Sequence, residues 1–202
     1  MGVLLAGGPS RRYGGEPKGL EEVGGMRIAD RILHALAQAT ERQLVVANDP
    51  RAAEWFRGRV VVADERVGLG PLAGIATALA AADGDAVLVV AWDMPFVTAH
   101  LLQALRALGG GSVQAVVPSH GPSAQLEPLC AWYAASDLEP CRALLDTGER
   151  RASALSAVLP GTRLFTDAEL APFDKPEHLF TSVDSPDDLV RAQRLVEPSP
   201  DR

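Results

Sequence analysis

The feature that most constrains this chain is a basic, glycine-rich loop that follows a short apolar run at the N-terminus. Residues 2–6 are apolar, and the segment GGPSRRYGGEPK at 7–18 comes directly after them. Its four glycines let the backbone approach a ligand closely, and successive N–H groups in such a loop form an anion-binding concavity. The segment is neither a Walker A loop nor the Rossmann G-x-G-x-x-G. It predicts a buried strand that leads into a phosphate-binding loop.

The charge of this loop contrasts with that of the rest of the chain. Residues 11–18 carry three cations against one carboxylate, whereas the 202-residue chain has a net charge of −7. A basic island in an acidic protein suits a small anionic ligand, and the acidic balance disfavours general nucleic-acid binding. Of 19 basic residues only Lys18 and Lys175 are lysines. A lysine in an arginine-rich chain indicates a site that needs a compact ammonium group.

Apolar runs and helix-like patterns alternate along the whole chain. Strands are predicted at 2–6, 44–47, 60–63, 86–91, 113–117, 126–133, 163–165 and 179–183. Helices are predicted at 28–36, shortly after 48–50, and at 71–82, 98–108, 139–145 and from 186 onward. Continuous apolar strands that alternate with helices indicate an α/β fold, a mostly parallel sheet with helices on both faces.

Several residues mark the expected ends of these elements. Pro71 suits a first helical turn, and Thr98 is placed to cap the helix at 98–108. Ser136 and Glu139 have the spacing of a capping box. Pro128 interrupts the run at 126–133, which indicates a bent or edge strand.

Two carboxylates follow predicted strands. Asp64 comes after the strand at 60–63, and Asp93 comes after the strand at 86–91. In parallel sheets ligands bind beyond the carboxyl ends of the strands, at a topological switch point. Asp93 is therefore placed to hold Mg²⁺ between phosphate oxygens, with a helix cap as the alternative. The glycines at 68–74 open a helix whose N-terminus either faces the ligand or serves packing alone.

Composition disfavours several other classes of protein. Cys130 and Cys141 lack metal-ligand spacing, and the four histidines form no H-E-x-x-H pattern. No apolar run approaches the ~18 residues of a membrane helix. The N-terminus lacks the basic leader of a signal peptide, so a cytoplasmic location without membrane contact is expected.

The set of motifs resembles that of the molybdenum cofactor guanylyltransferases, within the nucleotidyltransferases. The family's first loop, L-A-G-G-x-S-x-R-x-G-x-x-K, is matched at 5–18 with one extra residue before the lysine. Its G-P-L-A-G is matched at 70–74, and its D-x-P is matched at 93–95. Further matches in the family's order are Pro128-Leu129, residues 148–151 and residues 185–189. The resemblance covers nearly the whole chain.

The resemblance implies a Rossmann-like, three-layer nucleotidyltransferase fold in a single domain, residues 1–202. It implies a nucleotide-binding half at 1–110, an acceptor-binding half at 111–196 and a tail at 197–202. The implied reaction transfers GMP from GTP to the terminal phosphate of molybdopterin and releases pyrophosphate, with Mg²⁺ as cofactor. The implied partners are GTP, molybdopterin, and molybdoenzymes or their chaperones.

Two alternatives stay open. One is a related nucleotidyltransferase that uses CTP or another phosphorylated acceptor, and the other is a non-catalytic nucleotide-binding module. Cytidylyltransferases of this group usually carry L-A-A-G in the first loop, so Gly8 favours guanine.

The resemblance also assigns the site residues. Lys18 would bind phosphate, Asp93 would bind Mg²⁺ and the triphosphate, and Arg12 would assist them in catalysis. The nucleotide-binding residues it implies are Leu5, Ala6, Gly7, Gly8, Ser10, Lys18, Asn48, Asp64 and Asp93. Asp64 falls on the guanine side, and Asn48 matches a family asparagine only after a shift.

Other positions carry open roles or depart from the family's pattern. Arg150 and Arg151 either receive the phosphate of the second substrate or form a solvated helix end. Ser182 and Asp184 stand where the family often has N-x-N, on the pterin side. Pro17 replaces a common aspartate before the lysine, which stiffens the loop and removes one N–H.

Overall fold

The computed structural model describes residues 1–7 and 17–196 of the chain. The first-loop residues Gly8, Ser10 and Arg12 and the expected tail at 197–202 lie outside the described residues.

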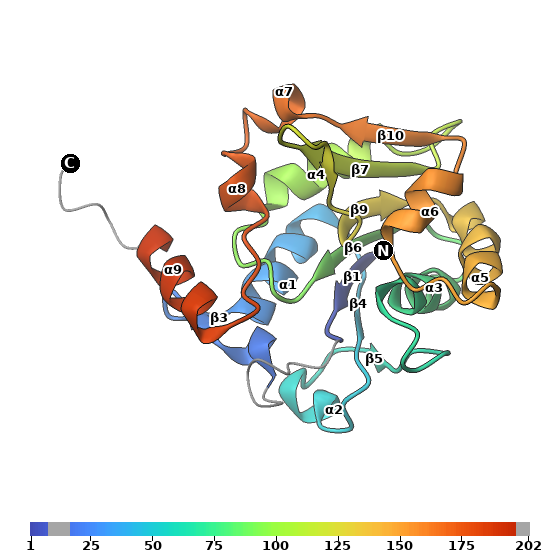
Figure 1. The fold of residues 1–202 in the computed structure, drawn as a ribbon. Helices are drawn as coiled ribbons and strands as arrows, with labels where there is room; N and C mark the ends of the chain where they lie inside the picture. The colour runs from blue at the N-terminus through green and yellow to red at the C-terminus, as the bar shows by residue number, and fades with distance from the viewer. Residues whose placement is uncertain (8–16, 197–202) are drawn as a thin grey trace.

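A mixed sheet runs through the molecule (Figure 1). Its strands follow in the order β10 (Thr162–Phe165), β7 (Ala115–His120), β9 (Cys130–Tyr133), β6 (Val87–Ala91), β1 (Gly2–Leu5), β4 (Gln43–Val46) and β5 (Val61–Val62), with β8 (Gln125–Leu126) paired beside β7. Strand β9 is antiparallel to β6 and β7, whereas β1 is parallel to β4 and β6, β5 to β4, and β10 to β7. The predicted mostly parallel sheet is thereby confirmed.

Helices cover both faces of the sheet (Figure 1). One face carries α1 (Ile28–Ala39), α2 (Ala52–Trp55), α4 (Ala99–Leu108), α7 (Asp167–Leu170), α8 (Pro176–Leu179) and α9 (Pro186–Val196). The other carries α3 (Pro71–Ala81), α5 (Leu138–Asp146) and α6 (Ser153–Val158). Short elements complete the fold: the turns Lys18–Leu20 and Ala135–Asp137, and the hairpin of β2 (Glu22–Val23) and β3 (Met26–Arg27). This three-layer arrangement confirms the expected fold class.

The residues of β1 show how one strand serves both layers. Successive side chains of a strand point to opposite faces. Leu4 accordingly packs into the core beneath α1 and α4, while Val3 and Leu5 pack into the core beneath α3, α5 and α6. Both faces of β1 are therefore dry, which explains why its sequence is apolar throughout.

Two predicted helix starts are confirmed. Pro71 occupies the first turn of α3, where its missing N–H removes no helical hydrogen bond. Thr98 precedes α4, and its Oγ1 accepts a hydrogen bond from the N–H of Leu101 at 3.3 Å. Helices α3 and α4 therefore begin where the sequence predicted.

The capping box predicted at Ser136 and Glu139 is wrong. A 3₁₀ turn occupies Ala135–Asp137, so α5 begins at Leu138 and Ser136 lies inside the preceding turn. The carboxylate of Asp137 accepts the N–H of Ala134 at 3.1 Å instead. Glu139 pairs with Arg142 at 3.1 Å on the helix surface.

The run predicted as a bent or edge strand at 126–133 is interrupted by a turn at Pro128, and the edge alternative is wrong. It divides into β8 and β9, and β9 lies between β6 and β7 rather than at an edge. Pro128 stands before β9, in the turn that leads into it. Its missing N–H therefore removes no ladder bond, and the strand does not need an edge position.

The strand predicted at 179–183 does not form. Leu179 ends α8, the N–H groups of Phe180 and Thr181 bond back to that helix, and none of residues 180–183 belongs to a strand. Leu179, Phe180 and Val183 are buried in the core beneath α1 and α4. Their apolar pattern reflects burial under a covering segment, which sequence periodicity cannot distinguish from a short strand.

Gly19, which follows Lys18, packs against the indole ring of Trp92. A Cβ at position 19 would meet ring atoms at 2.3 to 2.9 Å. We expect Gly19→Ala to lower the free energy of unfolding by about 1–3 kcal/mol, the usual cost of overpacking. Denaturant unfolding measures this difference.

The matched control is Gly74→Ala within α3. A Cβ there would lie 3.4 Å from Leu5 and 3.7 Å from Asp64, and alanine is the better helix former by about 1 kcal/mol. This variant should be at least as stable as the parent chain. Equal stability of both variants would contradict the close approach at Gly19.

Within the described residues, no helix combines the length and the apolar character needed to cross a bilayer.

Candidate active site

Strands β1 and β6 flank a topological switch point. From β1 the chain proceeds to β4 and β5 on one side, and then crosses through α3 to β6 on the other side of β1. Helices α1 and α3 accordingly lie on opposite faces. The carboxyl ends of β1 and β6 thus enclose the crevice where doubly wound sheets bind ligands.

Polar residues stand just beyond the strands that form this edge. Asn48, Asp64 and Asp93 each lie two residues past the end of β4, β5 and β6, respectively. Lys18 opens the turn that leads from β1 toward α1. The structure therefore brings the predicted lysine, asparagine and both aspartates to one edge of the sheet.

Lys18 forms the centre of the site, between two carboxylates. Its Nζ lies 2.5 Å from Asp93 Oδ2 and 2.5 Å from Asp184 Oδ1. The side chains of Lys18 and Asp93 are only 12% and 15% exposed, whereas that of Asp184 is 47% exposed. A largely desolvated ion pair is thus joined by a second, more accessible carboxylate.

The pKa values of Lys18 and Asp184 favour the charged forms of these two groups. Burial of Lys18 disfavours the ammonium, but Asp93 and Asp184 outweigh burial and hold the pKa of Lys18 above its usual value. Burial is the largest influence on Asp184 and opposes its ionisation, but the hydrogen bond and the charge of Lys18, together with the hydrogen bond from Ser182, outweigh burial and lower the pKa of that carboxyl. The site therefore presents fixed charges of both signs near neutral pH.

The segment that carries Asp184 is fastened directly to the Asp93 loop. The N–H of Val183 donates to the carbonyl oxygen of Asp93 at 2.9 Å, and Ser182 Oγ donates to Asp184 Oδ2 at 2.9 Å. The sequence marks Asp184 only as a departure from the family's N-x-N and predicts no contact between Asp184 and Lys18. Its distance from Lys18 along the chain, 166 residues, explains why local patterns did not reveal the contact.

Asn48 and Asp64 bond to one another at the ends of β4 and β5. Asn48 Nδ2 donates to Asp64 Oδ2 at 2.7 Å, and the N–H of Asp64 donates to Asn48 Oδ1 at 2.8 Å. Asp64 Oδ1 is buried and has no hydrogen-bond partner within residues 1–7 and 17–196. Because a buried acceptor is costly to leave unpaired, this oxygen suits a ligand N–H. Asn48 orients the carboxylate for it.

The end of β1 bears the first of the predicted backbone contacts. Leu5 and Ala6 are buried, and Gly7 is the first exposed residue beyond the strand. The Ala6 N–H donates to the Val46 carbonyl at 2.8 Å, and the Leu5 carbonyl accepts from the N–H of Trp92 at 3.2 Å. These bonds fix the strand end beside the switch point. The expected ligand contacts of Leu5, Ala6 and Gly7 stay predictions, as do those of Gly8, Ser10 and Arg12.

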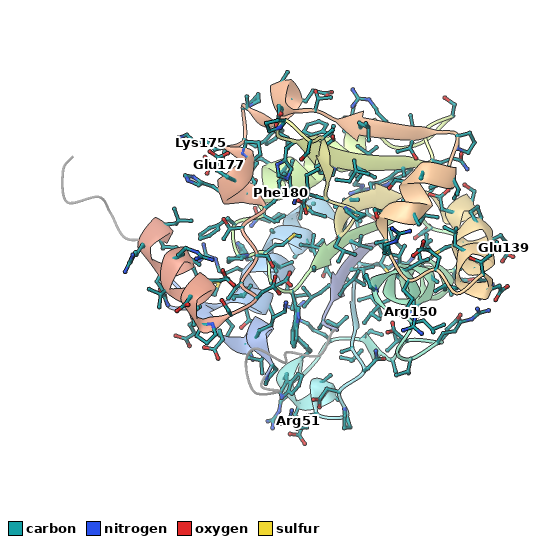
Figure 2. All side chains as sticks on the ribbon, viewed as in Figure 1. Arg51, Glu139, Arg150, Lys175, Glu177 and Phe180 are labelled. Atoms are coloured by element: carbon teal, nitrogen blue, oxygen red, sulfur yellow. The ribbon has the colours of Figure 1, made fainter. Side chains whose placement is uncertain are left out.

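The glycine segment at 68–74 packs against the backbone of Arg150 at the start of α3, and its ligand role stays a prediction. The N–H of Leu72 donates to the carbonyl oxygen of Arg150 at 3.3 Å, and a Cβ at Gly70 would lie 3.0 Å from that oxygen. Gly70 also has φ +76°, which favours glycine. Arg150 lies on the side of the molecule that carries α3 (Figure 2). Its neighbour Arg151 pairs with Glu149 at 2.8 Å. The phosphate role of the two arginines stays a prediction.

The arrangement suits a nucleotide with a divalent cation. Proteins hold Mg²⁺ through one or two carboxylates together with substrate phosphates, and Asp93 and Asp184 supply such oxygens. Lys18 supplies a point charge for phosphate. Together, this fold and this site place the protein in the class of α/β nucleotide-binding proteins.

The chain matches known proteins over nearly its whole length. Residues 2–162 match the family model described as the MobA-like NTP transferase domain. A Chloroflexus aggregans protein named "Probable molybdenum cofactor guanylyltransferase" is 36% identical over 202 residues, 96% of this chain and 94% of that protein. The molybdenum cofactor guanylyltransferase of Cereibacter sphaeroides is 31% identical over 200 residues, 97% of this chain and 96% of that protein.

A solved structure agrees with this likeness. The molybdopterin-guanine dinucleotide biosynthesis protein A of Archaeoglobus fulgidus superposes with a TM-score of 0.79 at 28% identity, and the match covers 96% of this chain and 98% of that one. The chain therefore belongs to the MobA-like NTP transferase family and is a nucleotidyltransferase.

Proposed function

We propose that this enzyme transfers GMP from GTP to the terminal phosphate of molybdopterin and releases pyrophosphate. The product is the guanine dinucleotide form of the molybdenum cofactor. The observation that carries the proposal is Lys18 between two carboxylates at the switch point, in a chain similar over nearly its full length to molybdenum cofactor guanylyltransferases.

The reaction needs little acid–base chemistry from the protein. A phosphate monoester is already anionic near neutral pH, because its second pKa is about 6. An oxygen of the acceptor phosphate attacks the α-phosphorus of GTP, the bond from that phosphorus to the bridging oxygen breaks, and pyrophosphate leaves. Catalysis then consists of positioning the two phosphates and neutralising their charge.

The charged residues of the site divide this work. Lys18 binds the phosphate oxygens of GTP, and its raised pKa keeps it cationic. Asp93, with Asp184 beside it, would hold Mg²⁺, which supplies charge neutralisation when bound. Arg12 is assigned a helping role on the triphosphate.

Guanine recognition is assigned to Asp64 on the far side of the switch point. Its buried, unpartnered Oδ1 suits the N1–H and amino donors of guanine, whereas the corresponding ring nitrogen of cytosine is an acceptor. Asn48 orients this carboxylate, and Leu5 to Gly8 and Ser10 line the nucleotide through the loop. Together with Gly8 in the first loop, Asp64 favours GTP over CTP.

The two halves of the chain, and the strands that each contributes to the sheet, then bind different substrates. We assign residues 1–110 to the nucleotide and residues 111–196 to the acceptor. Molybdoenzymes or their chaperones are the proposed recipients of the product, and the cytoplasm is the proposed location.

The proposal is tested by pyrophosphate release with molybdopterin and Mg²⁺, comparing GTP with CTP, ATP and UTP. We expect release with GTP alone. Release with CTP would retain the chemistry and overturn the roles of Gly8 and Asp64. Binding of GTP without any release would favour a non-catalytic nucleotide-binding module.

A further inference from the structure

A second polar cluster lies on the acceptor side of the site. Glu127 precedes β9, and its Oε1 accepts hydrogen bonds from His120 Nε2 at 2.9 Å and from Gln125 Nε2 at 2.9 Å. Its side chain is only 10% exposed. In the described part of the chain, the second oxygen of Glu127, Oε2, has no hydrogen-bond partner. A nearly buried carboxylate is thus fixed through one oxygen and leaves the other unpaired.

An aromatic stack packs beside this carboxylate. The ring of Phe180 stacks on the imidazole of His120, with centroids 5.1 Å apart and planes inclined by 20°. Phe180 follows the last residue of α8 and lies between that helix and the sheet (Figure 2). Phe180 is buried in the core, so the stack holds the imidazole of His120 in place, and His120 in turn holds Glu127. A fixed hydrogen-bond acceptor suits a heterocycle with N–H groups along one edge.

Backbone bonds connect this cluster to the Lys18 site. The carbonyl oxygen of Leu129, two residues after Glu127, accepts the N–H of Ala91 at 2.8 Å, directly before the Asp93 loop. On the other side, the chain from Phe180 to Asp184 spans at most about 14 Å. One short segment therefore contacts His120 at its start and Lys18 at its end.

The order of the strands places three groups in a row along the carboxyl edge. The Asp64 carboxylate stands at β5, the Lys18 site stands at β1 and β6, and the Glu127 cluster stands at β9 and β7. Two strand spacings, about 10 Å, separate β7 from β6. This order matches a base, a phosphate centre and a ring system joined to phosphate by a short linker.

We propose that Glu127 Oε2 accepts hydrogen bonds from the aminopyrimidine edge of the acceptor's pterin ring. The inference rests on the proposed function and extends it to acceptor specificity. A 2-amino-4-oxopyrimidine ring presents a ring N–H and an exocyclic amine, both donors. Bonds from His120 and Gln125 hold the carboxylate in place, so its free oxygen meets that edge without rearrangement.

The decisive variant is Glu127→Gln. Its amide oxygen can still accept from His120 and Gln125, while its NH₂ group replaces the free carboxylate oxygen and opposes the ring's donors. We expect the KM for molybdopterin to rise about 10- to 100-fold, the usual effect of an unmatched polar group in a binding site. The Kd for GTP and the melting temperature should stay close to those of the parent chain.

The matched control is Glu139→Gln on α5, across the molecule from α8 (Figure 2). Glu139 is exposed and pairs only with Arg142 among the described residues. Its removal should leave the KM for molybdopterin unchanged. A parent-like KM in Glu127→Gln would overturn the inference.

A second measurement needs no variant. Binding of 6-hydroxymethylpterin phosphate is compared by calorimetry with binding of its 2,4-dioxo counterpart, which lacks the exocyclic amine, in the presence of Mg²⁺ and a non-reactive GTP analogue. We expect the parent chain to favour the amino compound at least tenfold, and Glu127→Gln to lose that preference. Equal binding of the two compounds by a chain that makes the dinucleotide overturns this inference alone. Failure to form any dinucleotide overturns the proposed function with it.

Discussion

Asp93→Ala is expected to remove nearly all GMP transfer while the protein stays folded. The carboxylate lies at the end of β6, beside Lys18 and 15% exposed. Loss of one group that neutralises transition-state charge lowers kcat by roughly 10²–10³-fold. The fold should persist because Val183 bonds to the backbone carbonyl of residue 93, which the substitution retains. Steady-state pyrophosphate release and thermal unfolding measure the two effects separately.

Asp85→Ala is the matched control for this variant. Asp85 precedes β6 as Asp93 follows it, and it pairs with Arg42 at the opposite end of the sheet. Its loss should leave turnover unchanged, because an exposed ion pair contributes little. Turnover of Asp93→Ala close to that of Asp85→Ala would show that Asp93 has no part in the reaction.

Lys18→Ala is expected to produce a loss of comparable size. The ammonium is the only described side-chain cation within 4 Å of Asp93, and its raised pKa keeps it charged. Without it, the triphosphate meets two carboxylates with no cation from this turn to offset them. We expect kcat/KM for GTP to fall by roughly 10²-fold or more. Lys18→Arg should restore little, because a planar guanidinium differs in size and geometry from a compact ammonium.

The chain provides its own control for this substitution, since Lys175 is the only other lysine. Lys175 is exposed before α8 (Figure 2), and Lys175→Ala should retain full activity. If Lys18→Ala lowered only stability, and turnover of its folded fraction matched that of Lys175→Ala, the ion pairs of Lys18 would be structural alone.

Much of the fold could be predicted because its main signals are local. The continuous apolar runs at β1 and β6 require burial on both faces, which only a covered sheet provides. Thr98 marked a helix start through a hydrogen bond formed within one turn, and Pro71 did so because the first turn needs no N–H from that residue. Asn48, Asp64 and Asp93 lie two residues past their strand ends and therefore stand along one edge of the sheet, because parallel strands share one carboxyl edge.

The parts that could not be predicted depend on contacts between distant segments. Leu179 to Val183 read as a strand because burial under a covering segment leaves the same apolar pattern. The contact of Asp184 with Lys18 joins the two ends of the chain. Glu127 and His120 could not be predicted as site residues, since a carboxylate with one free oxygen is recognised only from its three-dimensional partners.

The most direct test of the account follows the α-phosphate of GTP. The enzyme is incubated with Mg²⁺, molybdopterin and GTP labelled at either the α- or the γ-phosphate, and the products are separated. We predict that the α-label appears in the pterin product and the γ-label in pyrophosphate. Transfer of the γ-label to the pterin, or release of inorganic phosphate in place of pyrophosphate, would contradict the account.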